Sequence, residues 1–235
     1  MSSFSCENLT IEVANVTAVK GLKLELNHGC YVIMGPNGSG KSSFAGAVAG
    51  RSAYKVSAGN LFVNSQAIND LDSYQRAKLG IFVTYQEPIE LLGVTFNQMY
   101  LAADPPVSEK QLSYAAELLE IDYEAFKDKV VNKDMSGGEK KRAELLNLMA
   151  LDPKVAILDE IDSGLDVDGL DLIKRAIKML FEINPKRVVV SITHYPKLAK
   201  ELSPEKVFIL KDGTIKASGG IDLIDEVSLK GYEAF

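Results

Sequence analysis

Gly35-Pro36-Asn37-Gly38-Ser39-Gly40-Lys41-Ser42 satisfies the pattern G-x-x-x-x-G-K-[ST] in full and decides how the rest of the chain is interpreted. An apolar segment ending at Met34 precedes it, and a plausible helix, Ser43 to Gly50, follows it. Glycines let the backbone curl so that successive N–H groups face phosphates, and the helix start adds partial positive charge. Lys41 would place a cation on the β- and γ-phosphates, and the Ser42 hydroxyl can ligate Mg²⁺. This stretch therefore predicts a nucleotide-binding loop.

Strand patterns lie on both sides of the loop. Alternating apolar residues predict half-buried strands at 9–13 and 22–26. A mostly apolar run at 30–34 predicts a further strand, and two apolar runs at 155–158 and 188–192 resemble strands buried on both faces of a parallel sheet.

Two further kinds of pattern predict helices and a hairpin. Apolar residues recur at helical spacing over 112–119 and 145–151, inside a helix-rich stretch from about 90 to 150. Asp212-Gly213 lies between two short apolar segments and predicts a hairpin. Antiparallel strands at the start with strand–helix alternation later predict an α/β fold.

Length and composition exclude several classes of protein. The 235 residues suit one large domain, or one domain with a subdomain, and the net charge of −6 disfavours a nucleic-acid binder. No apolar stretch approaches the roughly 20 residues that span a bilayer. The first residues show no signal or transit pattern, so we expect a cytoplasmic protein or a processed organellar one. Cys6 and Cys30 are too few for a disulfide framework or for the roughly four ligands of an iron–sulfur cluster.

Two acidic residues end the apolar run at 155–158. Asp159 would hold Mg²⁺, directly or through water, and Glu160 would polarise the water that attacks the γ-phosphate. In an open parallel sheet, ligands gather at the carboxyl ends of the strands, where the phosphate loop also lies. Alone, the pair is more simply explained as solvated acids. Together with the loop, it predicts a metal and catalytic site.

A further stretch distinguishes between classes of nucleotide-binding protein. Met135-Ser136-Gly137-Gly138-Glu139-Lys140-Lys141-Arg142 places a hydroxyl and flexible backbone at a helix start, which favours a second anion site. Ser-Gly-Gly-Glu before a helix resembles the signature motif of the ABC ATPases. Gln86, Ser163-Gly164-Leu165-Asp166 and His194 follow the order of that family's Q-loop, D-loop and switch histidine.

The resemblance implies a fold and a set of site residues. It implies an ABC ATPase cassette over residues 1–235, with a RecA-like P-loop core, an N-terminal antiparallel β subdomain and a helical signature subdomain at about 90–150. It also implies ATP and Mg²⁺ as cofactors, and a second copy of the chain whose signature closes over the nucleotide. The implied catalytic residues are Glu160, His194 and Gln86; the nucleotide-binding residues Gly35, Pro36, Asn37, Gly38, Ser39, Gly40, Lys41, Ser42 and Ser43; the metal ligands Ser42, Gln86 and Asp159; and the dimer-site residues Ser136, Gly137, Gly138, Glu139 and Asp166.

Two motif variants narrow the resemblance to one branch of the family. Most ABC ATPases have Gln after Ser-Gly-Gly and Pro-Thr after the catalytic Glu. This chain has Glu139-Lys140-Lys141-Arg142 and Ile161-Asp162-Ser163, which resemble the branch that serves the SUF system of iron–sulfur cluster assembly. That branch implies the scaffold proteins SufB and SufD, or a SufB-only scaffold, as partners.

The expected partner-docking surface is residues 86–103. Ile89, Leu91, Leu92 and Phe96 could fill a partner groove there, and burial in the core is the equal alternative. Leu92 stands where the SUF branch has a proline.

Other functions share part of this pattern. A nucleotide-binding subunit of an ABC transporter has every catalytic motif and differs in what it docks on. A non-catalytic ATP switch would need damage at Glu160 or His194, and both are present. A nucleic-acid-linked ABC protein would need tandem cassettes or a basic surface, which the length and charge disfavour.

Overall fold

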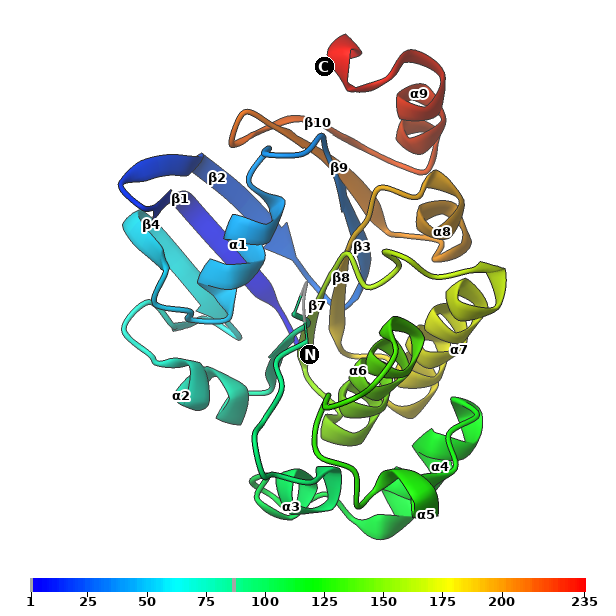
Figure 1. Ribbon diagram of the computed structural model, residues 1–235. Helices are drawn as coiled ribbons and strands as arrows, with labels where there is room; N and C mark the ends of the chain where they lie inside the picture. Colours follow the sequence, from blue (N-terminus) through cyan, green and yellow to red (C-terminus); the bar gives the residue numbers. More distant parts are fainter. Residues whose placement is uncertain (1, 86–87) are drawn as a thin grey trace.

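The computed structural model describes residues 2–85 and 88–235 as two sheets with helices between and beside them (Figure 1). The smaller sheet is antiparallel in the order β2-β1-β4-β5. Its strands are β1 (Phe4–Val13), β2 (Val16–Leu26), β4 (Tyr54–Val63) and β5 (Gln66–Ala67). Side chains alternate across a strand, so Phe4 and Cys6 turn inward, and a register shift after Cys6 resets the alternation so that Leu9 and Ile11 turn inward as well.

The larger sheet has the order β10-β9-β3-β8-β7-β6, with β10 antiparallel to β9 and the other pairs parallel. Every residue of β7 and β8 is buried, as their uniform apolar sequences predict. The strands are β3 (Gly29–Met34), β6 (Ile81–Val83), β7 (Val155–Asp159), β8 (Val188–Ile192), β9 (Lys206–Lys211) and β10 (Thr214–Gly219).

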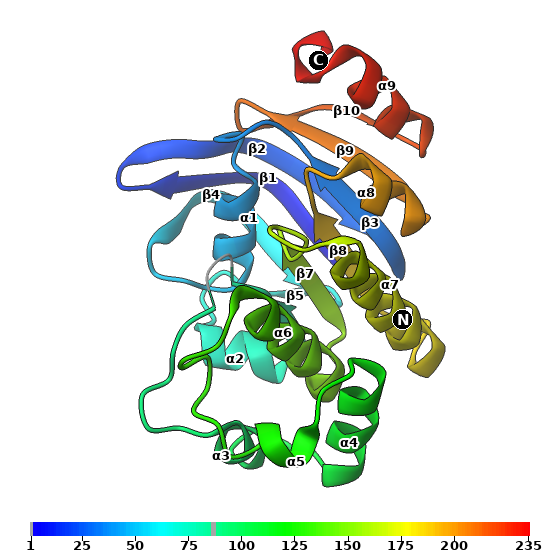
Figure 2. The same ribbon diagram turned by 45° about the vertical axis from the view of Figure 1, so that its right-hand side comes forward.

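Helix α1 (Lys41–Val48) lies between the two sheets (Figure 2). Its apolar residues share one core with both sheets, and Phe44 meets Phe4 edge to face at 6.0 Å between ring centroids. Helices α6 (Gly137–Leu151) and α7 (Val167–Ile183) contribute to a second core with β7 and β8. The loop before α1 is therefore anchored to the most buried part of the molecule.

The remaining helices lie around this centre. Between β6 and β7 in sequence, three short helices precede α6 and share its core; in Figure 1 they form the green lower part of the molecule. No described helix has the length and apolar character needed to cross a membrane. The helices are α2 (Ser73–Lys78), α3 (Phe96–Leu101), α4 (Glu109–Leu118), α5 (Tyr123–Phe126), α8 (Pro196–Glu201) and α9 (Asp222–Lys230), with a final 3₁₀ turn (Tyr232–Ala234).

The predicted α/β fold with an antiparallel β subdomain is confirmed, and so are the expected strands and the hairpin at Asp212-Gly213. Several boundaries differ. The helix after the loop begins at Lys41 rather than Ser43, and β1 and β2 extend beyond the alternating segments. Sequence reasoning did not identify β4, β5, α2 or β6. In β4 only Leu61 and Val63 are buried, so that strand lacks a continuous apolar pattern.

Candidate nucleotide-binding and hydrolysis site

The phosphate-binding loop joins β3 to α1, as the sequence predicts. Two of its glycines are required by close approach of the backbone. A Cβ atom at Gly35 would lie 2.0 Å from the Leu210 carbonyl oxygen, and one at Gly40 would lie 2.6 Å from that of Ala18. Gly40 also has φ of 104°, which a side chain would strain. The loop is therefore held in one curled shape by strands β2 and β9.

Lys41 turns its side chain back into this loop. Its Nζ donates hydrogen bonds to the carbonyl oxygens of Gly35 and Pro36, both at 2.9 Å. Burial lowers the pKa of the Lys41 ammonium, and the nearby carboxylates of Glu160 and Asp159 act in the opposite direction. A phosphate bound in the loop would add further negative charge beside this buried ammonium and stabilise its protonated form.

Ser42 and Asp159 meet across the site from elements 117 residues apart in sequence. The Ser42 hydroxyl donates to Asp159 Oδ1 at 3.3 Å, joining the start of α1 to the end of β7. Burial raises the pKa of Asp159. A hydroxyl and a carboxylate side by side are oxygen ligands that suit Mg²⁺, so these two residues fit the predicted metal site. Gln86, the third predicted ligand, lies outside the described residues.

Glu160 and His194 also lie together, at the carboxyl ends of the neighbouring strands β7 and β8. His194 Nε2 is 2.6 Å from Glu160 Oε1. The Glu160 backbone N–H donates to the Ile192 carbonyl at 3.0 Å, and Glu160 has φ of 49°. A non-glycine residue in this left-handed region costs about 1 kcal/mol or more, which is typical of turns at functional sites. The structure thus joins two residues that the sequence separates by 34 positions.

The signature residues begin helix α6. Ser136 is its N-cap, and its backbone N–H and hydroxyl both donate to Glu139 Oε2, at 2.9 and 2.8 Å. These hydrogen bonds lower the pKa of Glu139. A Cβ atom on Gly137 or Gly138 would meet nothing within 4 Å. Packing inside the described chain does not require either glycine, and their surface leaves room for another molecule to approach closely.

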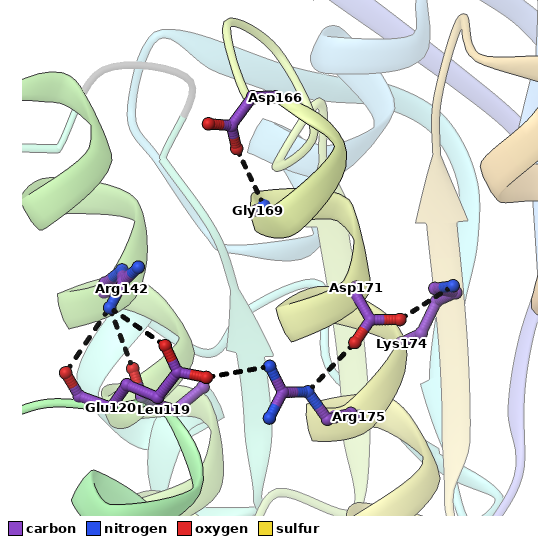
Figure 3. Close-up of polar contacts among 8 residues, drawn as sticks. All are labelled: Leu119, Glu120, Arg142, Asp166, Gly169, Asp171, Lys174 and Arg175. Atoms are coloured by element: carbon purple, nitrogen blue, oxygen red, sulfur yellow. Dashed lines mark hydrogen bonds and ion pairs between the residues drawn. The ribbon is translucent and has the colours of Figure 1, made fainter.

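The segment after Glu160 is fixed at both ends. Asp162 is buried and accepts a hydrogen bond from the Thr193 hydroxyl, and its burial raises its pKa. Asp166 caps helix α7 by accepting from the Gly169 backbone N–H at 2.9 Å (Figure 3). Asp166 therefore holds the start of α7 in this chain.

Surface ion pairs connect the signature helix to α7 (Figure 3). Arg142 of α6 donates to the carbonyl oxygens of Leu119 and Glu120, at 3.3 and 3.4 Å, beyond the end of α4. The Glu120 carboxylate lies 3.1 Å from Arg175, which lies 3.1 Å from Asp171 on the same helix. Each such exposed pair contributes less than about 1 kcal/mol to the stability of the fold. The connection therefore orients α6 and α7 more than it stabilises them.

Three polar residues around this site were not predicted as site residues, although Lys141 was named as part of the signature variant. Thr84 Oγ1 accepts from the Asp159 backbone N–H at 2.6 Å, and Lys141 Nζ donates to the Glu160 carbonyl oxygen at 3.3 Å. Glu144 is buried one turn along from Lys141. Charges at positions three apart on the apolar face of a helix are the signal that could have identified the last two.

Three of the four apolar residues expected at the docking surface are exposed, and the docking itself stays a prediction. Ile89, Leu91 and Leu92 are exposed, with Leu92 at 82%. Phe96 is 0% exposed and stacks on Phe126 with 4.1 Å between ring centroids. Phe96 thus belongs to the core under α3, where the apolar face of that helix buries it, so of its two alternatives burial in the core is confirmed.

Burial raises the pKa of Glu144 to about 7, well above its ordinary value. Since the folded pKa exceeds the unfolded one, the folded chain keeps a proton that the unfolded chain loses, and stability falls as pH rises from about 4.5 to 7. We expect Glu144→Gln to raise the free energy of unfolding by roughly 3 kcal/mol at most at pH 8, and by less than about 1 kcal/mol at pH 5. Thermal or urea unfolding at both pH values measures the change in the free energy of unfolding, with a substitution of an exposed residue, Glu117→Gln, as control. An equal increase at pH 5 and pH 8 would contradict the raised pKa of Glu144.

The fold and the site together define a P-loop ATPase of the ATP-binding cassette class, with a phosphate loop after β3, two carboxylates at the end of β7, a histidine after β8 and a signature helix. The chain belongs to the ABC transporter family, whose model matches residues 19–163. It is accordingly an ABC-type ATPase that binds and hydrolyses ATP.

Relatives and solved structures agree with this family. A protein of Cyanophora paradoxa named "Probable ATP-dependent transporter ycf16" is 36% identical over 97% of this chain and 92% of its own length. "Vegetative protein 296" of Bacillus subtilis (strain 168) is 33% identical over 99% of this chain and 92% of its own. The ATP-binding cassette MJ0796, solved as a dimer with ADP and Pi, has the same fold at a TM-score of 0.78 and 22% identity, over 93% of this chain and 98% of that one. A bacterial Atm1-family exporter with ATP bound matches 99% of this chain at a TM-score of 0.80 and 20% identity, and the match spans 41% of the exporter chain.

Proposed function

We propose that this chain is a SufC-type ATPase, the ATP-hydrolysing subunit of the SUF iron–sulfur cluster assembly complex. The observation that carries the proposal is the Ile161-Asp162-Ser163 variant in its structural setting. Asp162 is buried and accepts a hydrogen bond from Thr193, the residue before His194. The residue that marks the SUF branch is therefore part of the hydrolysis site. Glu139-Lys140-Lys141-Arg142, the second variant, opens the signature helix.

Within the site, each residue has a proposed task. The backbone N–H groups of residues 35–43, apart from Pro36, which has none, and the Lys41 ammonium hold the phosphates of ATP. Ser42, Asp159 and Gln86 would hold Mg²⁺, which supplies charge neutralisation at the phosphates when bound. Glu160 accepts the proton of the attacking water, and His194, 2.6 Å from it, keeps that carboxylate oriented toward the γ-phosphate.

The working unit in this proposal is a pair of chains. Ser136, Gly137 and Gly138 of one copy close over the nucleotide held by residues 35–43 of the other, and Asp166 lies at the same face. The open surface above the two signature glycines supports this arrangement. ATP then draws the copies together and hydrolysis releases them, which shifts bound partners between two states.

The proposed partners are the scaffold proteins SufB and SufD, or a SufB-only scaffold, on which the cluster is built. Purification of the tagged chain from its own source tests this directly. We expect it to recover those scaffold proteins. Recovery of a membrane permease instead would support the second candidate, a nucleotide-binding subunit of an ABC transporter. That candidate is favoured by the names of several relatives, which are called probable ATP-dependent transporters.

Ile89, Leu91 and Leu92 form the proposed docking surface. We expect Leu92→Asp to reduce scaffold recovery at least tenfold, because a carboxylate in an apolar contact costs more than about 1.4 kcal/mol. Leu229→Asp is the matched control, since Leu229 is 85% exposed on α9 and lies outside this surface. Quantitative pull-down with purified scaffold measures the effect. Equal recovery by the Leu92 and Leu229 variants would exclude this surface.

A further inference from the structure

Glu144 joins the signature helix to the end of strand β6. It lies on α6 and is 6% exposed. Its Oε1 accepts a hydrogen bond from the Tyr85 backbone N–H at 2.6 Å, across 59 residues of sequence. A carboxylate that accepts from a backbone N–H at this distance forms a strong, directional hydrogen bond. The contact therefore fixes the backbone at Tyr85 relative to α6.

The neighbouring residue, Thr84, carries this contact on to the metal site. Thr84 Oγ1 accepts from the Asp159 backbone N–H at 2.6 Å. On the other side of the segment, Arg51 donates to the Thr84 carbonyl at 3.0 Å and lies over the Tyr85 ring at 3.9 Å. Thr84 and Tyr85 are thus held from three directions. The path from the Glu144 carboxylate to the Asp159 backbone therefore consists of the hydrogen bond from the Tyr85 N–H, the peptide unit between Thr84 and Tyr85, and the hydrogen bond from the Asp159 N–H to Thr84 Oγ1.

This arrangement is costly for the fold. Glu144 Oε2 is buried without a hydrogen-bond partner among the described residues, and the nearest cation, Lys141 Nζ, lies 3.9 Å away. An unsatisfied buried oxygen costs about 1 to 3 kcal/mol, and more when charged. Burial also raises the pKa of Glu144 to about 7. An apolar side chain would fill the same space at a lower cost, so filling space does not explain a carboxylate here.

We propose that Glu144 is a positioning residue, which fixes Thr84 and Tyr85 and thereby orients Asp159 from the signature helix of the same chain. The proposal rests on ATP hydrolysis, which the family establishes, and not on the SUF assignment. A shift of α6 when its first residues engage a second copy would reach Asp159 through this contact. Loss of the contact should impair the chemical step and spare the binding of nucleotide, because Lys41 and the phosphate loop are untouched.

Three variants of the full chain test the proposal: Glu144→Leu, Glu144→Gln and Thr84→Val. We expect Glu144→Leu to lower kcat for MgATP at least tenfold, while Kd for ATP measured in EDTA stays within twofold of wild type. Glu144→Gln should keep at least half of kcat, because its amide oxygen can still accept from the Tyr85 N–H. Thr84→Val keeps the side-chain shape but removes Oγ1, so it should lower kcat as Glu144→Leu does.

Glu117→Gln is the control, because Glu117 is exposed on α4. A folded Glu144→Leu variant with wild-type kcat would overturn the proposal, and so would a Glu144→Gln variant as slow as the Leu one. If Glu144→Leu does not fold, Thr84→Val decides, and wild-type kcat there overturns the proposal. Failure of the SUF assignment would appear separately, as missing scaffold proteins with these kinetic results unchanged.

Discussion

We expect Glu160→Gln to abolish measurable steady-state ATP hydrolysis and to leave MgATP binding within about twofold of wild type. The amide has the shape of the carboxylate but cannot accept a proton from the attacking water. Loss of a positioned general base typically lowers kcat by about 10² to 10⁴. Glu160 lies at the end of β7 beside His194, and the Lys41 side chain that would bind phosphate is held by other contacts. Binding and turnover should therefore separate in this variant.

Phosphate release and nucleotide titration measure the two quantities on the same preparation. Glu182→Gln is a suitable control, since Glu182 lies near the other end of α7 and pairs only loosely with Lys178, at 3.8 Å. Normal turnover by the Glu160 variant would remove Glu160 from the catalytic role, and weakened MgATP binding would show that its charge acts on the bound nucleotide.

We expect Lys41→Ala to weaken MgATP binding by about 10- to 100-fold. Hydrogen bonds from a buried ammonium to phosphate oxygens contribute about 1.5 to 3 kcal/mol, and alanine supplies none of them. The substitution also leaves the carbonyl oxygens of Gly35 and Pro36 without their donor. A melting curve of the variant is therefore needed to show that the loop remains folded.

Isothermal titration with MgATP measures this loss, and Lys110→Ala, an exposed residue of α4, is the matched control. An Ala variant that is folded and binds MgATP with wild-type affinity would contradict the phosphate role of Lys41. A loss confined to ATP, with ADP bound normally, would place the ammonium on the γ-phosphate alone.

The phosphate loop and the strand ends beside it could be predicted because short, continuous stretches of sequence define them. A strand, a six-residue loop and a helix in direct succession define the position of Lys41, the first residue of that helix, without any distant contact. The position of Asp159 is also defined locally, because it ends a strand whose five residues are all buried. That Ser42 meets Asp159 followed from a general property of parallel sheets, whose carboxyl ends share one edge.

Other features depend on contacts between distant parts of the sequence. Thr84 and Glu144 belong to the site only because β6 and α6 approach each other, which no short pattern records. Phe96 could not be assigned to core or surface from its neighbours, and its stacking on Phe126 decides the matter. Strand β4 was missed for a related reason: pairing with β1 defines it more than its own apolar pattern does.

In the proposed function, ATP hydrolysis by this chain serves the SUF scaffold. The most direct test is the ATPase rate of the purified chain, measured with and without purified SufB and SufD at equal protein concentration. We expect a rate that rises at least severalfold with the scaffold and stays at the basal level when Leu92→Asp replaces the wild-type chain. An unchanged rate in the presence of the folded scaffold proteins would contradict it.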